Sequence, residues 1–366
     1  MFIEKLMIER VRNISKLEIR PHQRCNIIVG DNGSGKSSIL EAIHFLGFGR
    51  TFRKSKISEV IQFEQKDLVV FSSSQNAGAD KVQKNFGIKK SKSGDNEIRI
   101  GGVKAKRLSQ LSSQFPIISF TPDSIDLIEA GPSIRRKFID WLVFHVKQSE
   151  LVAQTYRDFD KVLEQRNHAL RLGDRKQIHA WTSQFIELNL QIQSYRAEII
   201  GLLNHEFQNS YIQVESSKFN FNPELIYKLG WNSELELKDI LARNLETEIK
   251  RKTTCFGVHR DDLILELNSV SVKNILSRGE CKRYVLAMLL AAENVISKNT
   301  DKNCIWLLDD IAAELDFESI KNAFSICNNV GNQMFFTCIE KDLELIKQVT
   351  NFGYSVFHVK HGELLN

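Results

Sequence analysis

Residues 30–37 read Gly30-Asp31-Asn32-Gly33-Ser34-Gly35-Lys36-Ser37, and no other stretch of the chain constrains its architecture as strongly. A glycine, four residues and then Gly-Lys-Ser is the spacing of a phosphate-binding loop. The apolar run 25–29 before it predicts a strand, and the apolar residues of 36–46 recur at helical spacing. Strand, glycine-rich loop and helix are the order in which such a loop binds nucleotide phosphates. We therefore predict a P-loop nucleotide-binding fold.

Each position of this loop has a chemical role in phosphate binding. The glycines let backbone N–H groups close around phosphate oxygens, the Lys36 ammonium reaches the outer phosphates and takes part in catalysis, and the Ser37 hydroxyl ligates Mg²⁺. The expected cofactors are therefore ATP and Mg²⁺. The residues expected to contact the nucleotide here are Gly30, Asp31, Asn32, Gly33, Ser34, Gly35, Lys36, Ser37 and Ser38.

A second motif, at residues 305–310, reads Ile-Trp-Leu-Leu-Asp-Asp. A short buried strand that ends in two carboxylates is typical of a Walker B segment. We expect Asp309 to hold Mg²⁺ and Asp310 to orient or deprotonate the attacking water. The alternative for Asp310 is a structural one, the N-cap of a helix over 311–313.

Residues 276–280, Leu-Ser-Arg-Gly-Glu, resemble the ABC signature that is usually written LSGGQ. The pentapeptide opens a predicted helix about thirty residues before the Walker B segment. A serine at such a helix start can contact a γ-phosphate held in the P-loop of a second subunit, so that ATP joins two heads. We therefore add Ser277 and Gly279 to the expected nucleotide contacts, with an ordinary helix cap as the alternative.

Composition limits the class of protein. With 366 residues, of which 42% are hydrophobic and 26% charged, the chain is long enough for two lobes. No run approaches the roughly 18–20 apolar residues of a membrane-spanning helix, and charges occupy the start of the chain. The six cysteines have no metal-ligand spacing, which indicates reduced thiols in the core. We expect a soluble, cytoplasmic protein with no membrane partner.

Charge is spread unevenly along the chain. Residues 76–107 carry nine basic and three acidic side chains, whereas residues 301–366 carry five basic and ten acidic ones. This asymmetry favours a polyanionic partner, and few aromatic residues lie among the basic ones, so we expect contacts to duplex DNA backbone. The candidates are Arg50, Arg53, Lys54 and Lys56 with the cluster from Lys81 to Arg107.

The remaining pattern indicates an interrupted α/β domain. Residues 69–120 alternate and contain many turn residues, and beyond residue 250 strands at 263–267, 305–308, 333–338 and 355–359 alternate with helices. Residues 133–217 lack proline and predict two antiparallel helices that meet at Gly173-Asp174. The predicted fold class is α/β: an ABC-type ATPase head, residues 1–132 plus 250–366, with a helical lobe inserted at 133–249. The lobe is a short hairpin and not a long coiled coil.

Along its whole length the chain resembles the RecF family of bacterial ABC-type, SMC-like ATPases. The resemblance assigns Asp316 to a D-loop that crosses between subunits and adds it to the expected nucleotide contacts. The sequence departs from the family pattern at Val11 and Val258, and Arg278 stands where most ABC proteins have glycine. No histidine follows the strand 333–336, so Thr337 is the candidate for the γ-phosphate switch residue. The matching segments are 11–13, 30–37, 49–53, 120–123, 131–136, Tyr156, 165–167, 257–262, 276–280 and 308–316.

The resemblance implies a function in recombinational repair and replication-fork restart. It implies a weak, DNA-stimulated ATPase whose heads dimerise with ATP on gapped DNA or at a junction of single- and double-stranded DNA. It also implies RecR and RecO as partners, help in loading RecA over single-strand-binding protein, and SOS induction. The alternatives are an ABC transporter subunit, disfavoured by the roughly 240 residues between Lys36 and Ser277, and a structural SMC-like head, disfavoured by the lack of a long coiled coil.

Overall fold

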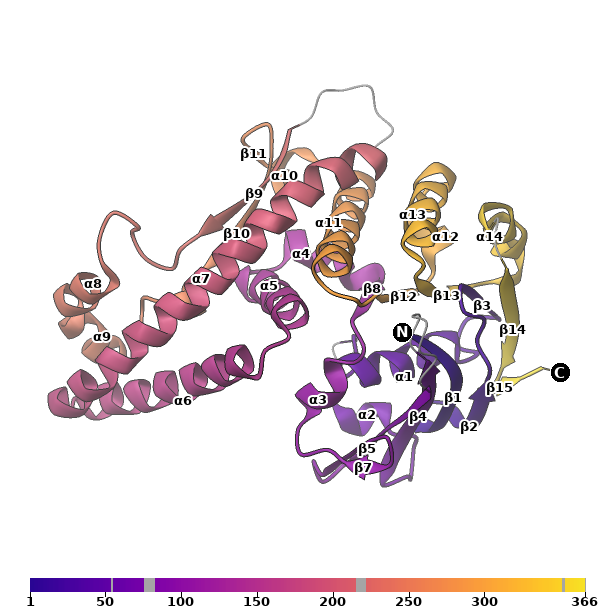
Figure 1. The fold of residues 1–366 in the computed structure, drawn as a ribbon, viewed down its shortest axis with the longest axis horizontal. Helices are drawn as coiled ribbons and strands as arrows, with labels where there is room; N and C mark the ends of the chain where they lie inside the picture. Colours follow the sequence, from indigo (N-terminus) through magenta and orange to yellow (C-terminus); the bar gives the residue numbers. More distant parts are fainter. Residues whose placement is uncertain (54, 76–82, 215–221, 351–352, 366) are drawn as a thin grey trace. The chain divides into compact units, whose positions relative to one another are not determined.

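The computed structural model describes residues 1–53, 55–75, 83–214, 222–350 and 353–365. The chain divides into two compact units. Figure 1 shows the ribbon with colours that follow the sequence from the N-terminus to the C-terminus. The first comprises Met1–Ile125, Ser210–Lys218 and Ser277–Asn366, and the second comprises Asp126–Asn209 and Phe219–Leu276. Each is described by itself below.

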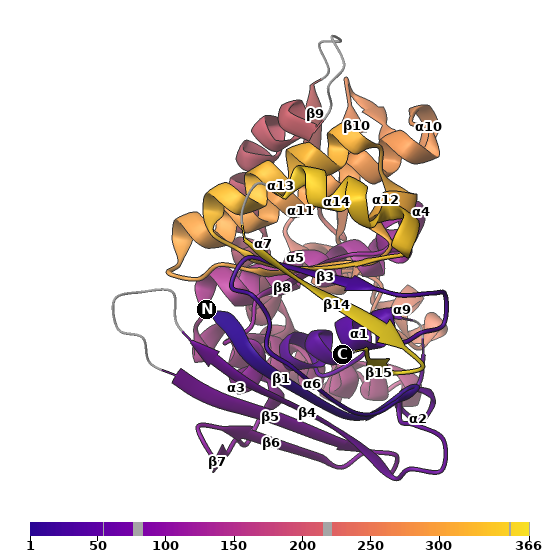
Figure 2. The ribbon, with the colours of Figure 1, turned by 90° about the vertical axis from the view of Figure 1, so that its right-hand side faces the viewer.

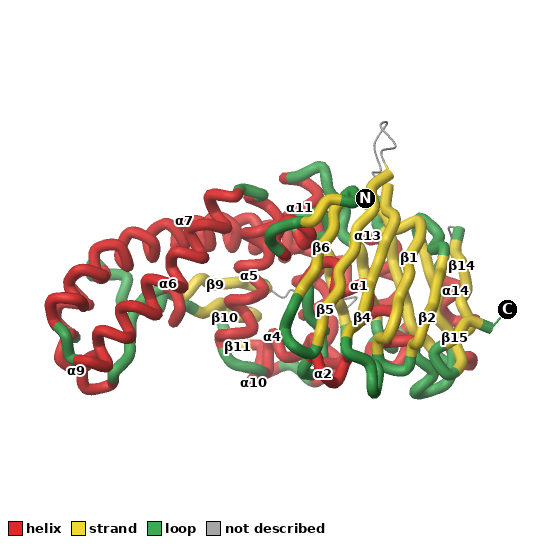
Figure 3. The backbone as a smooth tube through the Cα atoms, turned by 90° about the horizontal axis from the view of Figure 1, so that it is seen from below, coloured by secondary structure: helices red, strands yellow, loops and turns green. Residues whose placement is uncertain are grey.

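The first unit contains two six-stranded sheets. One is antiparallel, with the order β2-β1-β4-β5-β6-β7, and Figure 3 shows its strands side by side. The other has the order β15-β14-β3-β13-β12-β8 and is parallel except for its β14–β15 hairpin. The antiparallel strands are β1 (Phe2–Val11), β2 (Ile14–Ile19), β4 (Asp67–Gln75), β5 (Gln83–Ser91), β6 (Asn96–Ile100) and β7 (Val103–Lys104). The others are β3 (Cys25–Val29), β8 (Ile117–Phe120), β12 (Ile305–Leu308), β13 (Gln333–Cys338), β14 (Tyr354–Lys360) and β15 (Glu363–Leu364).

Helix α1 (Lys36–Phe48) fills the space between these sheets. Its apolar residues, among them Ile39 and Leu40, share one buried cluster with Leu6 of β1 and with Leu307 and Phe335 of the parallel sheet. Every residue of β3, β12 and β13 is buried, as expected for parallel strands that are covered on both faces. Figure 2 shows three helices on the side of the parallel sheet that faces away from α1: α11 (Arg278–Asn299), α13 (Phe317–Val330) and α14 (Leu343–Val349). This arrangement confirms the predicted ABC-type head.

The predicted helical hairpin belongs to the second unit, except for residues 210–214 at the end of its second helix, which belong to the first. The helices α6 (Glu150–Leu172) and α7 (Arg175–Val214) meet at Gly173, whose positive φ of 68° ends α6, and the Asp174 carboxylate accepts from the N–H groups of Lys176 and Gln177. A break at Gln148 and Ser149 was missed, and it separates α5 (Pro132–Lys147) from α6. The predicted end of the hairpin at 215–217 lies outside the described residues. Shorter elements are α4 (Asp126–Glu129), α8 (Leu237–Arg243), α9 (Leu245–Arg251) and α10 (Val272–Ile275).

The unit boundaries differ from the predicted lobes. The strand predicted at 263–267 is β10 (Asp262–Leu267), which pairs with β9 (Pro223–Lys228) and β11 (Val270–Ser271) in a small sheet of the second unit and not with the head. The antiparallel register aligns Leu265 with Leu225 and buries both. Since β9 was not recognised in the sequence, β10 had no predicted partner outside the head.

Several residues of the family motifs form buried polar networks in the second unit. The Arg166 guanidinium donates to Glu248 at 2.6 Å and to Thr254 at 2.7 Å. The Asp261 carboxylate accepts from Arg196 at 3.0 Å and from the Gly230 N–H at 2.7 Å. Because their donors and acceptors are used within the unit, Arg166 of the segment 165–167 and Asp261 of the segment 257–262 have a structural role.

The burial of most cysteine thiols agrees with the expectation that they lie in the core. All six cysteines are free, and all but Cys255 are buried; burial raises the pKa of the Cys338 thiol to about 12. Among the described helices, none is both long and apolar enough to cross a bilayer.

We predict that Arg166→Met destabilises the second unit by about 3–5 kcal/mol, because the buried Glu248 carboxylate then lacks its partner. Denaturant unfolding measures this change. The matched control is Arg175→Met, since the Arg175–Glu246 pair also joins the hairpin to α9 but both side chains are more than 60% exposed. Equal effects of the two variants would contradict the prediction, and adding Glu248→Leu to Arg166→Met should recover part of the loss.

Candidate nucleotide-binding site

The P-loop joins β3 to α1, and hydrogen bonds from its own lysine side chain hold it in a curved conformation. The Lys36 ammonium donates to the carbonyl oxygens of Gly30 at 2.8 Å and Asp31 at 3.0 Å. Gly33 and Gly35 have φ values of 79° and 115°, a region that favours glycine. A Cβ on Gly30 would lie 2.3 Å from the Val359 carbonyl oxygen, so a side chain there would displace β14. The sequence therefore needs glycine at each fixed glycine position of the loop.

The loop fits a polyphosphate. It places a buried ammonium, that of Lys36, at the N-terminal end of a 13-residue helix whose dipole also favours negative charge. The buried Ser34 hydroxyl has no hydrogen-bond partner among the described residues. A buried ammonium and a buried hydroxyl without a partner suit the oxygens of a phosphate, and the nucleotide contacts of 30–38 stay a prediction.

The Walker B carboxylate lies directly beside the loop. Asp309 is 4% exposed, and its Oδ1 atom accepts from the Ser37 hydroxyl at 2.9 Å and from the Thr337 hydroxyl at 2.7 Å. A serine hydroxyl and a carboxylate oxygen are the donor set that Mg²⁺ uses in P-loop proteins. The structure thus brings together the two residues, Ser37 and Asp309, that the sequence assigns to the metal.

Asp310 adopts an unusual backbone conformation. Its φ of 51° is left-handed, and its side chain makes no capping hydrogen bond to α12 (Ile311–Glu314). The capping alternative for Asp310 is therefore not observed. Burial, and then the neighbouring Asp309 carboxylate, raise the pKa of Asp310 above its ordinary value. A raised pKa makes a carboxylate a better proton acceptor.

The Arg53 side chain approaches the Asp309 carboxylate, although the sequence analysis gave Arg53 as a candidate for DNA contact. Its guanidinium lies 3.8 Å from Asp309 Oδ2. The segment that carries it is fixed from α1: His44 Nδ1 bonds to the Arg50 carbonyl oxygen at 2.7 Å, and Thr51 donates to Glu41. Burial lowers the pKa of His44 to about 4, so this imidazole is neutral near pH 7.

The signature and D-loop residues begin helices at the surface. Ser277 is the N-cap of α11 in a capping box: its hydroxyl accepts from the Glu280 N–H at 3.4 Å, and Glu280 accepts from the Ser277 N–H at 2.7 Å. Ser277 and Gly279 are exposed. Asp316 accepts from the N–H and hydroxyl of Ser319, at 2.8 and 3.0 Å. The capping interpretation of Ser277 is thus present in the structure, and the exposed hydroxyl remains accessible to a second molecule.

Two residues that the sequence analysis did not assign to the site, Asn13 and Gly362, hold the P-loop by hydrogen bonds. We call these two residues the clamp. Asn13 donates to the Gly33 carbonyl oxygen at 3.2 Å and accepts from the Ser38 hydroxyl at 3.2 Å. The Gly362 N–H donates to the Ser34 carbonyl oxygen at 2.7 Å. The only signal for Asn13 in the sequence was its place in the motif 11–13.

The basic cluster predicted for DNA is divided. Lys89 is paired with Asp67 at 3.1 Å, Arg99 is paired with Glu97 at 2.8 Å, and Lys90 is half-buried. Lys54 and Lys81 lie outside the described residues. Among the described residues of this unit, the other exposed candidates are Arg50, Arg53, Lys56, Lys84, Lys92, Lys104, Lys106 and Arg107.

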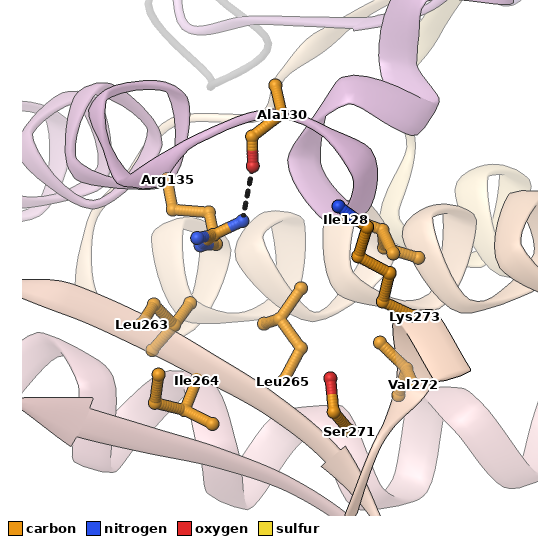
Figure 4. Close-up of a pocket in the computed structure, with 9 residues that line it drawn as sticks. All are labelled: Ile128, Ala130, Arg135, Leu263, Ile264, Leu265, Ser271, Val272 and Lys273. Atoms are coloured by element: carbon orange, nitrogen blue, oxygen red, sulfur yellow. Dashed lines mark hydrogen bonds between the residues drawn. The ribbon is translucent and has the colours of Figure 1, made fainter. Parts of the chain in front are cut away.

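A pocket of about 140 Å³ in the second unit is better explained by packing than by ligand binding. Figure 4 shows its apolar lining, which includes Leu263 and Leu265 of β10. The Arg135 guanidinium at its edge is already bonded to the Ala130 carbonyl oxygen at 2.9 Å and to both oxygens of Asp262. Lys273 donates to the Glu129 carbonyl oxygen at 3.3 Å. Because both cations already have hydrogen-bond acceptors, their charges give no reason to expect a bound anion in this pocket.

Comparison with known proteins agrees with this geometry. Residues 2–364 match the RecF/RecN/SMC N-terminal domain model. The DNA replication and repair protein RecF of Pseudomonas paraeruginosa is 34% identical over 366 residues, covering 100% of this chain and 97% of its own. The chain belongs to the RecF family. RecF of Pseudomonas putida is also 34% identical, over 367 residues that cover 100% of this chain and 98% of its own.

Solved structures show the same fold. The recombination mediator protein RecF with ATP, of the RecFOR pathway, superposes with a TM-score of 0.87 at 24% identity, over 100% of this chain and 98% of its own. An Smc head bound to the C-terminal winged-helix domain of ScpA gives a TM-score of 0.60 at 17% identity, over 100% of this chain and 96% of its own. The RecF family and the Smc heads therefore share the ABC-type ATPase architecture.

We predict that Gly362→Ala weakens ATP binding about tenfold, a change of about 1.4 kcal/mol. A Cβ there would lie 2.3 Å from the Asn13 carbonyl oxygen and push the clamp off the P-loop. Titration with ATP measures the affinity. Gly102→Ala is the control, because Gly102 has the same φ of 82° but no atom within 4 Å of an added Cβ. If both variants bind ATP alike, the clamp does not position the loop.

Proposed function

We propose that this chain is an ATP-dependent DNA-binding ATPase of recombinational repair. The observation that carries the proposal is the contact of Ser37 with Asp309 beside the Lys36 ammonium, which forms a site for Mg²⁺ and a triphosphate in a RecF-family head. The segments proposed as the signature helix and the D-loop belong to the same compact unit as this contact, which supports the proposal. A site with these parts binds ATP and hydrolyses it.

In the proposed mechanism the residues of the head bind and orient. The N–H groups of 30–35 and the Lys36 ammonium hold the β- and γ-phosphates. Ser37 and Asp309 would hold Mg²⁺, which would supply positive charge next to the phosphate oxygens. The Asp310 carboxylate accepts a hydrogen bond from the attacking water and receives its proton.

ATP also joins two copies of the chain. Ser277 is exposed at the start of α11, so its hydroxyl and the helix dipole can complete a site on another head. With two such sites, binding of ATP closes the dimer and hydrolysis opens it. Asp316 is the proposed contact between subunits near these sites.

The proposed substrate of the dimer is DNA at a gap or at a junction of single- and double-stranded segments. The support is the family name of the relatives and the exposed basic residues of the head, such as Arg50 and Lys84. We propose a weak ATPase that DNA stimulates, in the cytoplasm, with RecR and RecO as partners. RecA loading over single-strand-binding protein, fork restart and SOS induction are the proposed outcomes.

We predict that Asp310→Asn binds ATP normally and accumulates as a dimer. The amide cannot take the proton from water, whereas Ser37 and Asp309 still hold the metal. Turnover should fall by at least about 100-fold, measured as phosphate release, while sedimentation detects the trapped dimer. Hydrolysis at the rate of the unmodified protein would show that Asp310 is not the base.

The composite site is tested by mixing two inactive variants. Lys36→Met removes the charge that binds the outer phosphates, and Ser277→Arg blocks the approach of the signature helix. Each homodimer then lacks one element in both of its sites. In the heterodimer one site carries both lesions and the other pairs an intact Lys36 with an intact Ser277. Partial ATP-dependent association should therefore return on mixing, measured by sedimentation with and without a gapped duplex.

The controls separate assembly from folding. Each variant alone should remain a folded monomer with ATP, and Ser277→Arg should keep its own ATP affinity. A Ser277→Arg protein that dimerises by itself would contradict the signature assignment. The mixture could also associate with ATP no better than either variant alone. That result would contradict the proposal that Ser277 acts on the P-loop of the other subunit and that one intact site is enough for association.

A further inference from the structure

Thr337 is a fully buried residue near the carboxyl end of β13. The parallel register pairs Leu308 with Phe336, so the next residues along the two strands, Asp309 and Thr337, lie beside each other. The Thr337 hydroxyl donates to Asp309 Oδ1 at 2.7 Å and accepts from the Asp310 N–H at 2.8 Å. One hydroxyl therefore contacts both residues of the acidic pair.

The bond to Asp309 sets the rotation of that carboxylate. Oδ1 accepts from two hydroxyls, those of Ser37 and Thr337, which approach from α1 and from β13. Two donors that reach one oxygen from different elements restrict the rotation of the carboxyl group more than a single donor would. The other oxygen, Oδ2, then faces the Arg53 guanidinium at 3.8 Å.

The bond to the Asp310 N–H supports a strained backbone. A left-handed conformation at a residue other than glycine costs on the order of 1 kcal/mol and persists where its surroundings hold it. At Asp310, with φ 51° and ψ 40°, the described bond to the backbone N–H comes from Thr337. Asp310 is the residue at the N-cap of α12, and its side chain makes no capping hydrogen bond there.

We propose that Thr337 is a positioning residue of the hydrolytic site, whose hydroxyl holds the Asp309 carboxylate and the Asp310 backbone in the arrangement that hydrolysis needs. The inference rests on the proposed ATPase function and adds a residue to it. It differs from the sequence expectation that Thr337 acts as the γ-phosphate switch, which stays a prediction. In this structure the single proton of the Thr337 hydroxyl is donated to Asp309.

The test compares two substitutions that differ in the hydroxyl. Thr337→Val keeps the shape and removes the hydroxyl, whereas Thr337→Ser keeps the hydroxyl and removes a methyl group. We expect Thr337→Val to bind ATP within about twofold of the unmodified protein and to hydrolyse it at least about tenfold more slowly, about 1.4 kcal/mol in the barrier. Thr337→Ser should hydrolyse ATP within about twofold of the unmodified rate.

A second readout does not depend on turnover. Hydrogen exchange of the Asp310 amide should be slow in the unmodified protein and in Thr337→Ser, and fast in Thr337→Val. Should the valine variant not fold, Thr337→Ala removes the same hydroxyl without placing a second methyl group in the core.

The outcomes are distinguishable. Normal turnover by a folded Thr337→Val protein overturns the proposal, and so does equal slowing by valine and serine, which would indicate packing. An Asp310 amide that exchanges alike in all variants also overturns it. If the unmodified protein does not hydrolyse ATP, the proposed ATPase function fails, while selective exchange in Thr337→Val still supports the positioning contact.

Discussion

The hydrogen bond between Ser37 and Asp309 joins residues 272 positions apart in the sequence, and the candidate site depends on it. Ser37 lies in the first turn of α1, and Asp309 follows β12. Neither residue is a site alone, because a hydroxyl and a carboxylate must share one cation to act on a phosphate. The head is therefore built so that both ends of the chain contribute to one sheet.

The parallel sheet provides this arrangement. Strand β13 lies between β3, which leads into the P-loop, and β12, which leads into the Walker B carboxylates. The carboxyl ends of parallel strands meet at one edge, which is where ligands bind in open α/β sheets. Thr337 on β13 occupies the middle of this edge and bonds to the residues that follow β12. The strand that separates the two motifs thus also connects them.

The second unit contains buried ion pairs. Among its described residues, two buried arginines each contact an anion: Arg166 contacts Glu248, and Arg196 contacts Asp261. A buried pair is costly to break even where it adds little net stability, since one partner then remains desolvated. Several of the motifs that carried the family resemblance belong to these networks, so their presence reports the fold of this unit more than its chemistry.

The sequence by itself determined the motifs and most elements of the head. The P-loop, the strands at 25–29, 305–308 and 333–338 and the α6–α7 hairpin were predictable because their signals are local: glycine spacing, continuous apolar runs and helical periodicity. Only the tertiary structure decided which strands pair. Strand β10 joined the second unit because β9 supplies its backbone partners, and β9 has a weak local signal. The contacts of Asn13, Arg53, Thr337 and Gly362 with the site were likewise outside the reach of the sequence, since a hydrogen bond across hundreds of residues depends on strand register and left-handed turns that no local pattern records.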